Sequence, residues 1–181
     1  MKALLDTCVI YPTVMRQMLL GAARAGAFTP IWSARIIEEW QRATIKLGAD
    51  GVAQAASEAA LVAMDWPGAE VHWPASLEAR LWLPDPADIH VLAAAIAGSA
   101  DVIVTLNSKD FPRQILAEEG LSRSDPDAFL HGVWQAQPEM MADVAIGVLG
   151  EARRLGGKDW TMRPLMKKAR LPRLAKALTQ D

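Results

Sequence analysis

The first 124 residues alternate between short apolar runs and longer segments whose apolar residues recur at helical spacing. Ala3 to Leu5 is an apolar run and predicts a buried strand. Residues 28–32 and the β-branched run 101–105 predict two more strands. Helices are expected over residues 12–26, 33–47, 50–64, 90–97 and 111–119. Strands separated by helices favour parallel pairing, so the pattern predicts an α/β fold.

The pattern changes after Ser124. Asp125-Pro126 is typical of a helix start, since proline suits the first helical position. Apolar residues at helical spacing continue to the end of the chain, with breaks at prolines and at Gly156-Gly157, and no further strand is predicted. We therefore expect one α/β domain over residues 1–124 and an all-helical C-terminal extension over residues 125–181.

Composition narrows the class of protein. With 51% hydrophobic residues and a net charge of -2, the 181-residue chain is neither disordered nor a polycation. Its one cysteine, Cys8, excludes an intrachain disulfide and is expected to be a small buried apolar residue. The N-terminal apolar run is broken by Asp6, and no run approaches a membrane span. We expect a cytoplasmic protein that does not enter the membrane.

Charge is uneven along the chain. Residues 158–181 hold seven basic side chains against Asp159 and Asp181, a net charge of +5, so the rest of the chain carries -7. Three interpretations remain open for these basic side chains: contact with RNA phosphates, a solvated helix face, or a clasp on an acidic protein surface.

Four acidic residues stand out as candidate metal ligands. Asp6 and Asp110 each follow a predicted strand, and the carboxyl ends of parallel strands meet at one edge of a sheet. Glu39 lies in the predicted helix 33–47, and Asp88 lies in the first turn of the helix that opens after Pro86 and continues over residues 90–97. Carboxylates brought together repel one another unless a hard cation such as Mg²⁺ or Mn²⁺ binds them. Each also has a structural interpretation: Asp6 suits a plain turn, Asp88 and Asp110 suit helix starts, and Glu39 suits a solvated helix face.

Four segments resemble the successive blocks of the PIN-domain family, and the VapC toxin type within it. They are LLDT at 4–7, IIEE at 36–39, LPDPADIHVLAAA at 83–95 and VTLNSKDFP at 104–112, so the resemblance covers roughly residues 1–115. It implies a PIN-like parallel sheet flanked by helices, with metal-dependent phosphodiester cleavage by the domain at 1–124. The family's acidic quartet maps onto Asp6, Glu39, Asp88 and Asp110, with Glu38 as a competing choice for Glu39.

The resemblance also implies a function and partners. The expected protein is an endoribonuclease using Mg²⁺ or Mn²⁺, the toxin of a type II toxin–antitoxin pair, a homodimer, and a binder of RNA and of a cognate antitoxin protein. The residues expected to orient ligands or water are Thr7, Asp85, Thr105 and Asn107. Asp85 before Pro86 also suits a helix cap, and Asn107 stands where many members have aspartate, so it either ligates weakly or only hydrogen-bonds.

Other functions stay open or are excluded. A PIN nuclease of RNA processing or of structured DNA, and a non-catalytic PIN binding module, are the alternatives to a toxin. Nucleotide-binding folds and serine hydrolases are disfavoured because the chain has no GxGxxG, GxxxxGK[ST] or GxSxG motif. The three histidines, at positions 72, 90 and 131, are expected to be structural.

Overall fold

The structure is a computed structural model that describes residues 1–179; Asp181, counted above in the basic segment, lies outside this range. The chain forms two compact units. The first contains residues 1–11 and 29–123, and the second contains residues 12–28 and the chain from residue 124 onward. The second unit therefore includes an N-terminal helix that the sequence pattern did not associate with the extension.

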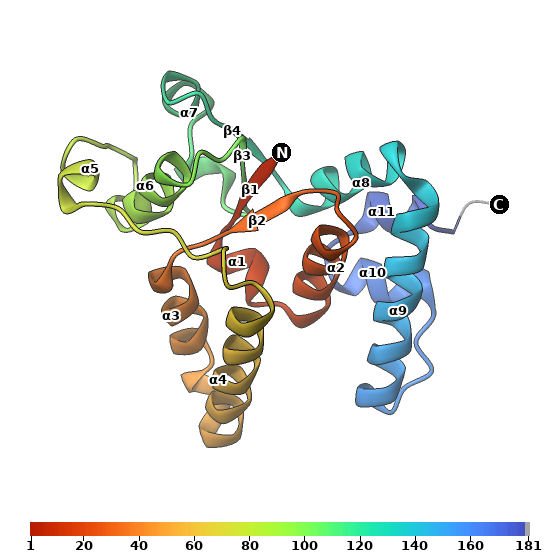
Figure 1. The fold of residues 1–181 in the computed structure, drawn as a ribbon. Coiled ribbons are helices and arrows are strands. Elements are labelled where there is room, and N and C mark those ends of the chain that lie inside the picture. The colour runs from red at the N-terminus through yellow and green to blue at the C-terminus, as the bar shows by residue number, and fades with distance from the viewer. Residues whose placement is uncertain (180–181) are drawn as a thin grey trace. The chain divides into compact units, whose positions relative to one another are not determined.

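The first unit is built on a four-stranded sheet in the order β2-β1-β3-β4 (Figure 1). The central strand β1 pairs in parallel with β2 and with β3, which places Leu4 opposite both Ile31 and Ile103. This sheet, with helices flanking it, confirms the predicted PIN-like α/β fold. The strands are β1 (Lys2–Leu5), β2 (Thr29–Ile31), β3 (Val102–Val104) and β4 (Ser122–Ser124).

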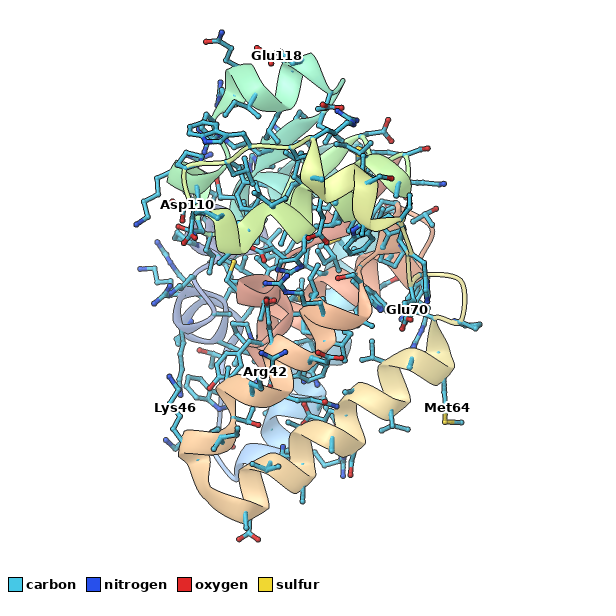
Figure 2. All side chains as sticks on the ribbon, turned by 90° about the vertical axis from the view of Figure 1, so that its left-hand side faces the viewer. Arg42, Lys46, Met64, Glu70, Asp110 and Glu118 are labelled. Carbon is cyan, nitrogen blue, oxygen red and sulfur yellow. The ribbon has the colours of Figure 1, made fainter. Side chains whose placement is uncertain are left out.

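Six helices belong to the same unit as this sheet. The alanine-rich α6 packs against β1 and buries all residues from His90 to Ala95. Helices α3 and α4 lie side by side, and Figure 2 shows Lys46 near the turn between them and Met64 pointing outward from α4. The helices are α1 (Thr7–Ile10), α3 (Ala34–Ala43), α4 (Gly48–Asp65), α5 (Ala75–Ala79), α6 (Ile89–Ala97) and α7 (Arg113–Glu118), with 3-10 turns η1 (Ile45–Leu47), η2 (Pro86–Asp88) and η3 (Ser108–Asp110).

The helix expected over residues 33–47 is shorter than predicted. It starts as expected, because Ser33 caps it by accepting a hydrogen bond from the Ile36 amide. It ends at Ala43, because the Thr44 hydroxyl donates to the Gln41 carbonyl at 2.6 Å and satisfies a helix-end acceptor. Gly48, expected to close this helix, instead begins α4. Helices α1 and α5 and strand β4 were not predicted.

The second unit is all-helical, as predicted for the C-terminal part of the chain. Helix α2 packs against α8 and α9, and Phe28 meets Phe129 edge to face with ring centroids 5.0 Å apart. Among residues 1–179, no helix has the length and apolar character needed to cross a membrane. The helices are α2 (Thr13–Arg24), α8 (Pro126–Ala136), α9 (Pro138–Gly156), α10 (Met162–Lys168) and α11 (Pro172–Ala177).

One buried carboxylate links two helices of this unit. Asp127 in α8 is only 6% exposed. Its two oxygens accept hydrogen bonds from the backbone amides of Arg173 at 2.9 Å and Leu174 at 3.0 Å. These amides start α11 and have no partner within that helix, so Asp127 satisfies them from a different helix.

We expect Asp127→Ala to destabilise the protein by about 2 kcal/mol, because it leaves two helix-start amides unpaired. The matched control is Asp125→Ala, which removes only the exposed cap bond to the Ala128 amide of α8. Its expected loss is about 1 kcal/mol. Urea denaturation followed by circular dichroism compares the two, and equal stability of Asp127→Ala and the parent would contradict the assignment.

Candidate metal centre

Asp6 is fixed at the carboxyl end of β1 by donors from two adjacent strands. It is 7% exposed, and its Oδ2 accepts a hydrogen bond of 2.7 Å from the Thr105 hydroxyl, which follows β3. Its Oδ1 accepts from the Thr7 amide at 2.7 Å. Because β1 and β3 are parallel neighbours, this bond joins two residues that are 99 positions apart in the chain.

Cys8 makes polar contacts beside Asp6, although apolar packing was expected. Its thiol donates to Asp6 Oδ2 at 3.2 Å and its sulfur accepts from the Leu106 amide at 3.2 Å. Burial, with the Asp6 charge adding to it, raises the pKa of the thiol to about 12. Cys8 therefore stays protonated at neutral pH and is a poor nucleophile.

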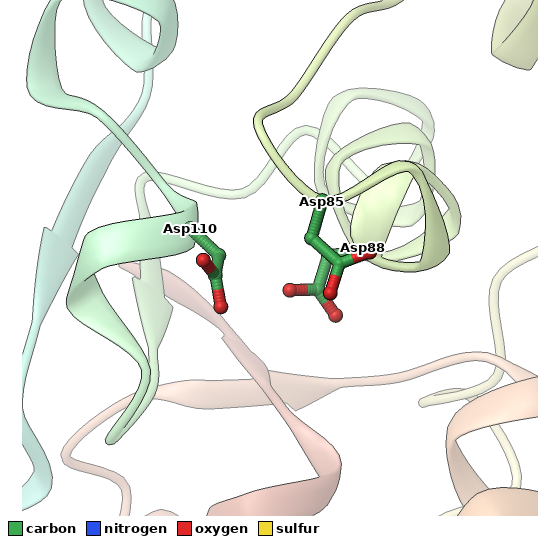
Figure 3. Close-up of side chains that lie close together, drawn as sticks. All are labelled: Asp85, Asp88 and Asp110. Atoms are coloured by element: carbon green, nitrogen blue, oxygen red, sulfur yellow. The ribbon is translucent and has the colours of Figure 1, made fainter.

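Three aspartates come together in front of α6 (Figure 3). One carboxylate oxygen from each of Asp85, Asp88 and Asp110 lies within 4.8 Å of the other two. Asp85 accepts from the Ala87 amide at 2.9 Å and caps η2, so the expected cap is present and the same side chain also reaches the cluster. Asp110 accepts a hydrogen bond from the side-chain amide of Asn107. Asn107 therefore supports a neighbouring carboxylate.

Asp88 is a half-buried carboxylate whose negative charge is not fully compensated by donors or cations among the described residues. Its Oδ2 is buried and has no hydrogen-bond partner among the described residues. Burial raises the pKa of Asp88 to about 6, and the negative charges of four other carboxylates add to this shift. These carboxylates belong to Asp6, Asp85, Asp110 and Glu39.

Glu39 approaches this cluster from α3, and its two oxygens are both held. Oε2 accepts from the Thr7 hydroxyl at 2.9 Å, whereas Oε1 lies 3.1 Å from His90 Nε2 and 3.4 Å from Arg35 Nε. The neighbouring Glu38 is 60% exposed and pairs with Arg42 at 3.1 Å. Of the two glutamates, Glu39 is the one whose charge acts on Asp88.

His90 is a neighbour of the site that sequence reasoning missed. It was interpreted as structural because it stands two positions from Asp88 on one helix. The structure places it 1% exposed against Glu39 of another helix, and burial lowers its pKa, so the imidazole is neutral. Its Nδ1 has no partner among the described residues, so we place the proton on Nε2, which donates to Glu39. The other two histidines lie elsewhere: His72 pairs with Glu70, and His131 stacks on Trp134.

This donor set fits a hard divalent cation. The charges of four other carboxylates act on Asp88, and its buried Oδ2 has no hydrogen-bond donor among the described residues. A cation such as Mg²⁺ supplies the positive charge that this oxygen lacks, and carboxylate oxygens are the ligands it prefers. Asp85, Asp88 and Asp110 are the residues already close enough together to share an ion.

Comparison with known proteins agrees with this geometry. The family model described as PIN domain matches residues 2–109, which is more than half of the chain and includes β1, α3, α6 and β3. No curated protein and no solved structure matches the chain. The parallel sheet, the acidic cluster at its carboxyl edge and the extent of this match agree, and the chain therefore belongs to the PIN-domain family.

Proposed function

We propose that this protein is a metal-dependent endoribonuclease, the toxin of a type II toxin–antitoxin pair. The observation that carries the nuclease proposal is the buried, unpartnered oxygen of Asp88 among four like charges. RNA as substrate, and the toxin role, rest on the resemblance of four segments to the VapC type. A PIN nuclease of RNA processing or of structured DNA is the alternative. A purely binding PIN module has no need for such a repulsive cluster.

The proposed roles use these contacts. Asp6, Glu39, Asp88 and Asp110 would hold Mg²⁺ or Mn²⁺. Asp85 would join them, because it lies beside Asp88 and Asp110. When bound, the metal supplies an activated water and stabilises charge on the leaving oxygen. The chain's own donors keep the ligands aligned: Thr105 holds Asp6, Asn107 holds Asp110, and Thr7 holds Glu39.

The wider proposal concerns assembly and location. Residues 1–124 would carry the nuclease domain and residues 125–181 its helical extension, with α2 of the first segment packing against α8 and α9 of the extension. The protein acts in the cytoplasm as a homodimer, and a cognate antitoxin protein inhibits it at the acidic cluster. A basic side chain of the antitoxin would be attracted by the same carboxylates that attract the metal.

Asp6→Asn and Asp88→Asn should each abolish Mn²⁺-dependent RNA cleavage, because each removes a charge that the metal requires. The matched control is Glu38→Gln, the same kind of change at the exposed neighbour of Glu39. The assay uses purified protein with tRNA, ribosomal RNA and single-stranded DNA as separate substrates. Full activity in either aspartate variant would sink the site assignment, and cleavage of DNA alone would sink the ribonuclease assignment.

The stability of the metal-free protein should fall as pH rises through the titration of Asp88. Its folded-state pKa of about 6 lies above the ordinary value of 3.8, so the folded state binds this proton more tightly than the unfolded state. The contribution of Asp88 protonation to the free energy of unfolding is therefore fully present below about pH 4 and is lost as pH rises through 6. We expect a loss of about 1 kcal/mol after solvent screening, or about 2–4 °C in melting temperature.

Thermal melts in EDTA at pH 4 and pH 7.5 test this. Asp88→Asn should melt higher than the parent at pH 7.5 and equally at pH 4. Mg²⁺ should restore the parent at pH 7.5 and leave the variant almost unchanged. Equal melting temperatures of the two EDTA-treated proteins at both pH values would show that the ionised Asp88 does not destabilise the fold.

His90→Leu should weaken metal binding, because it removes the donor that holds Glu39 Oε1. Loss of such a supporting hydrogen bond typically costs about 10–100-fold in metal affinity or activity. His90→Gln can present an N–H near the position of Nε2 and should recover most of the affinity. Mn²⁺ titration by calorimetry measures metal affinity, and melts in EDTA measure the stability of the metal-free protein. The two together distinguish a role of His90 in positioning Glu39 from a role in folding. Equal affinity for Mn²⁺ in the Leu and Gln variants would argue against a positioning role.

A further inference from the structure

A second charged surface lies in the helical unit and includes no residue of the metal centre. Seven basic side chains in and around α10 and α11 are exposed. Between residues 152 and 179 the sequence contains one acidic residue, Asp159. None of the seven forms an ion pair within the part of the chain that the structure describes. We call this set the basic surface: Lys158, Arg163, Lys167, Lys168, Arg170, Arg173 and Lys176.

Helix periodicity explains why these charges gather on the outside. In α10, Leu165 and Met166 are buried, and Arg163 and Lys167 occupy the opposite face four residues apart. In α11, Leu174, Ala175 and Ala177 are buried, and Arg173 and Lys176 face outward. Helices α10 and α11 pack against each other, so the basic residues on their outer faces belong to one helix pair.

Trp160 lies with its ring close to two lysines of the basic surface. The Lys168 Nζ lies 4.9 Å from the centre of its ring, and the Lys158 Nζ lies 5.9 Å from it. A ring face attracts ammonium groups without cancelling their charge. Trp160 thereby holds a lysine of the preceding loop near a lysine of α10, and both remain available to an anion.

Arg170 occupies a backbone position that favours glycine. Its φ is 60°, in the left-handed region, directly after α10. The Leu171 amide donates to the Met166 carbonyl at 2.9 Å, a helix-ending arrangement in which glycine is the usual residue at the position of Arg170. The exposed arginine therefore adds a charge where the backbone alone would favour a residue without a side chain.

We propose that the basic surface binds the sugar-phosphate backbone of single-stranded RNA. Unpaired, clustered lysines and arginines provide the electrostatic contacts that dominate non-specific nucleic-acid binding. Four of the seven are lysines, which are depleted at protein–protein interfaces, so their composition favours phosphates over an acidic protein. The choice of RNA rests on the proposed function, whereas the binding itself requires neither metal nor cleavage.

The experiment measures binding without catalysis. The full chain carries Asp6→Asn in EDTA, and the probe is a fluorescent single-stranded RNA titrated over a range of salt concentrations. Arg163→Glu with Lys167→Glu reverses two charges on α10, and the control is Arg42→Glu with Lys46→Glu, an arginine and a lysine at the same spacing on exposed positions (Figure 2). We expect the α10 pair to weaken binding about tenfold and to reduce the salt slope by about 1.4, with the control unchanged.

A second variant keeps the test decisive if the charge-reversed α10 variant does not fold. Arg170→Gly suits the left-handed backbone, so its melting temperature should equal or exceed that of the parent while RNA binding weakens. Unchanged affinity and salt slope in both folded variants would overturn the proposal. Binding of poly-glutamate in preference to RNA would also overturn it, in favour of an acidic protein partner.

The outcome is separable from that of the nuclease proposal. If the metal-free Asp6→Asn protein binds RNA through α10 but the wild-type protein cleaves nothing, the basic surface stands and the proposed function fails. If the wild-type protein cleaves RNA and the α10 variant binds and cleaves as well as the parent, the proposed function stands and the basic surface fails.

Discussion

Repulsion among five carboxylates at the carboxyl edge of a parallel sheet is the constraint on which the candidate site depends. The sheet brings Asp6 and Asp110 to this edge, the turn η2 before α6 presents Asp85 and Asp88, and α3 adds Glu39. Concentrated negative charge opposes folding unless donors or a cation offset it. The hydrogen bonds in the site supply part of that offset, and the remainder is available for metal binding.

The donors are distributed unequally among the carboxylates. Asp6 accepts from Thr105, Thr7 and Cys8, and Glu39 is held by Thr7, His90 and Arg35. Asp85 and Asp110 each have one donor, and Asp88 Oδ2 has none. Burial and the neighbouring negative charges raise the pKa of Asp88, the least supported carboxylate. The site thus has well-supported carboxylates at Asp6 and Glu39 and a carboxylate oxygen without a compensating partner at Asp88.

The two units differ in the sign of the charge they concentrate. The first gathers carboxylates at one edge of its sheet, and the second gathers lysines and arginines on the outer faces of α10 and α11. A nuclease has to attract both a cation and a polyanion, and one surface cannot attract both strongly. Under the two proposals made above, these tasks would fall to different units.

Local sequence determined much of this protein. The alternation of apolar runs predicted β1, β2 and β3, Ser33 and Asp85 marked helix starts, and the order of four motifs indicated the family. These signals are local, because hydrophobic periodicity and capping act within a few residues. Helix ends were less predictable: the Thr44 side chain bonds back to Gln41 and stops α3 early.

Only the tertiary structure decided which distant residues meet. Spacing along α6 separated His90 from Asp88, but packing of α3 against the site placed Glu39 within reach of His90. Asp85 was a cap by sequence and became a member of the acidic cluster once Asp110 lay opposite. Helix α2 was assigned to the second unit by its packing on α8 and α9. Such pairings depend on where crossover connections return the chain, which no local propensity encodes.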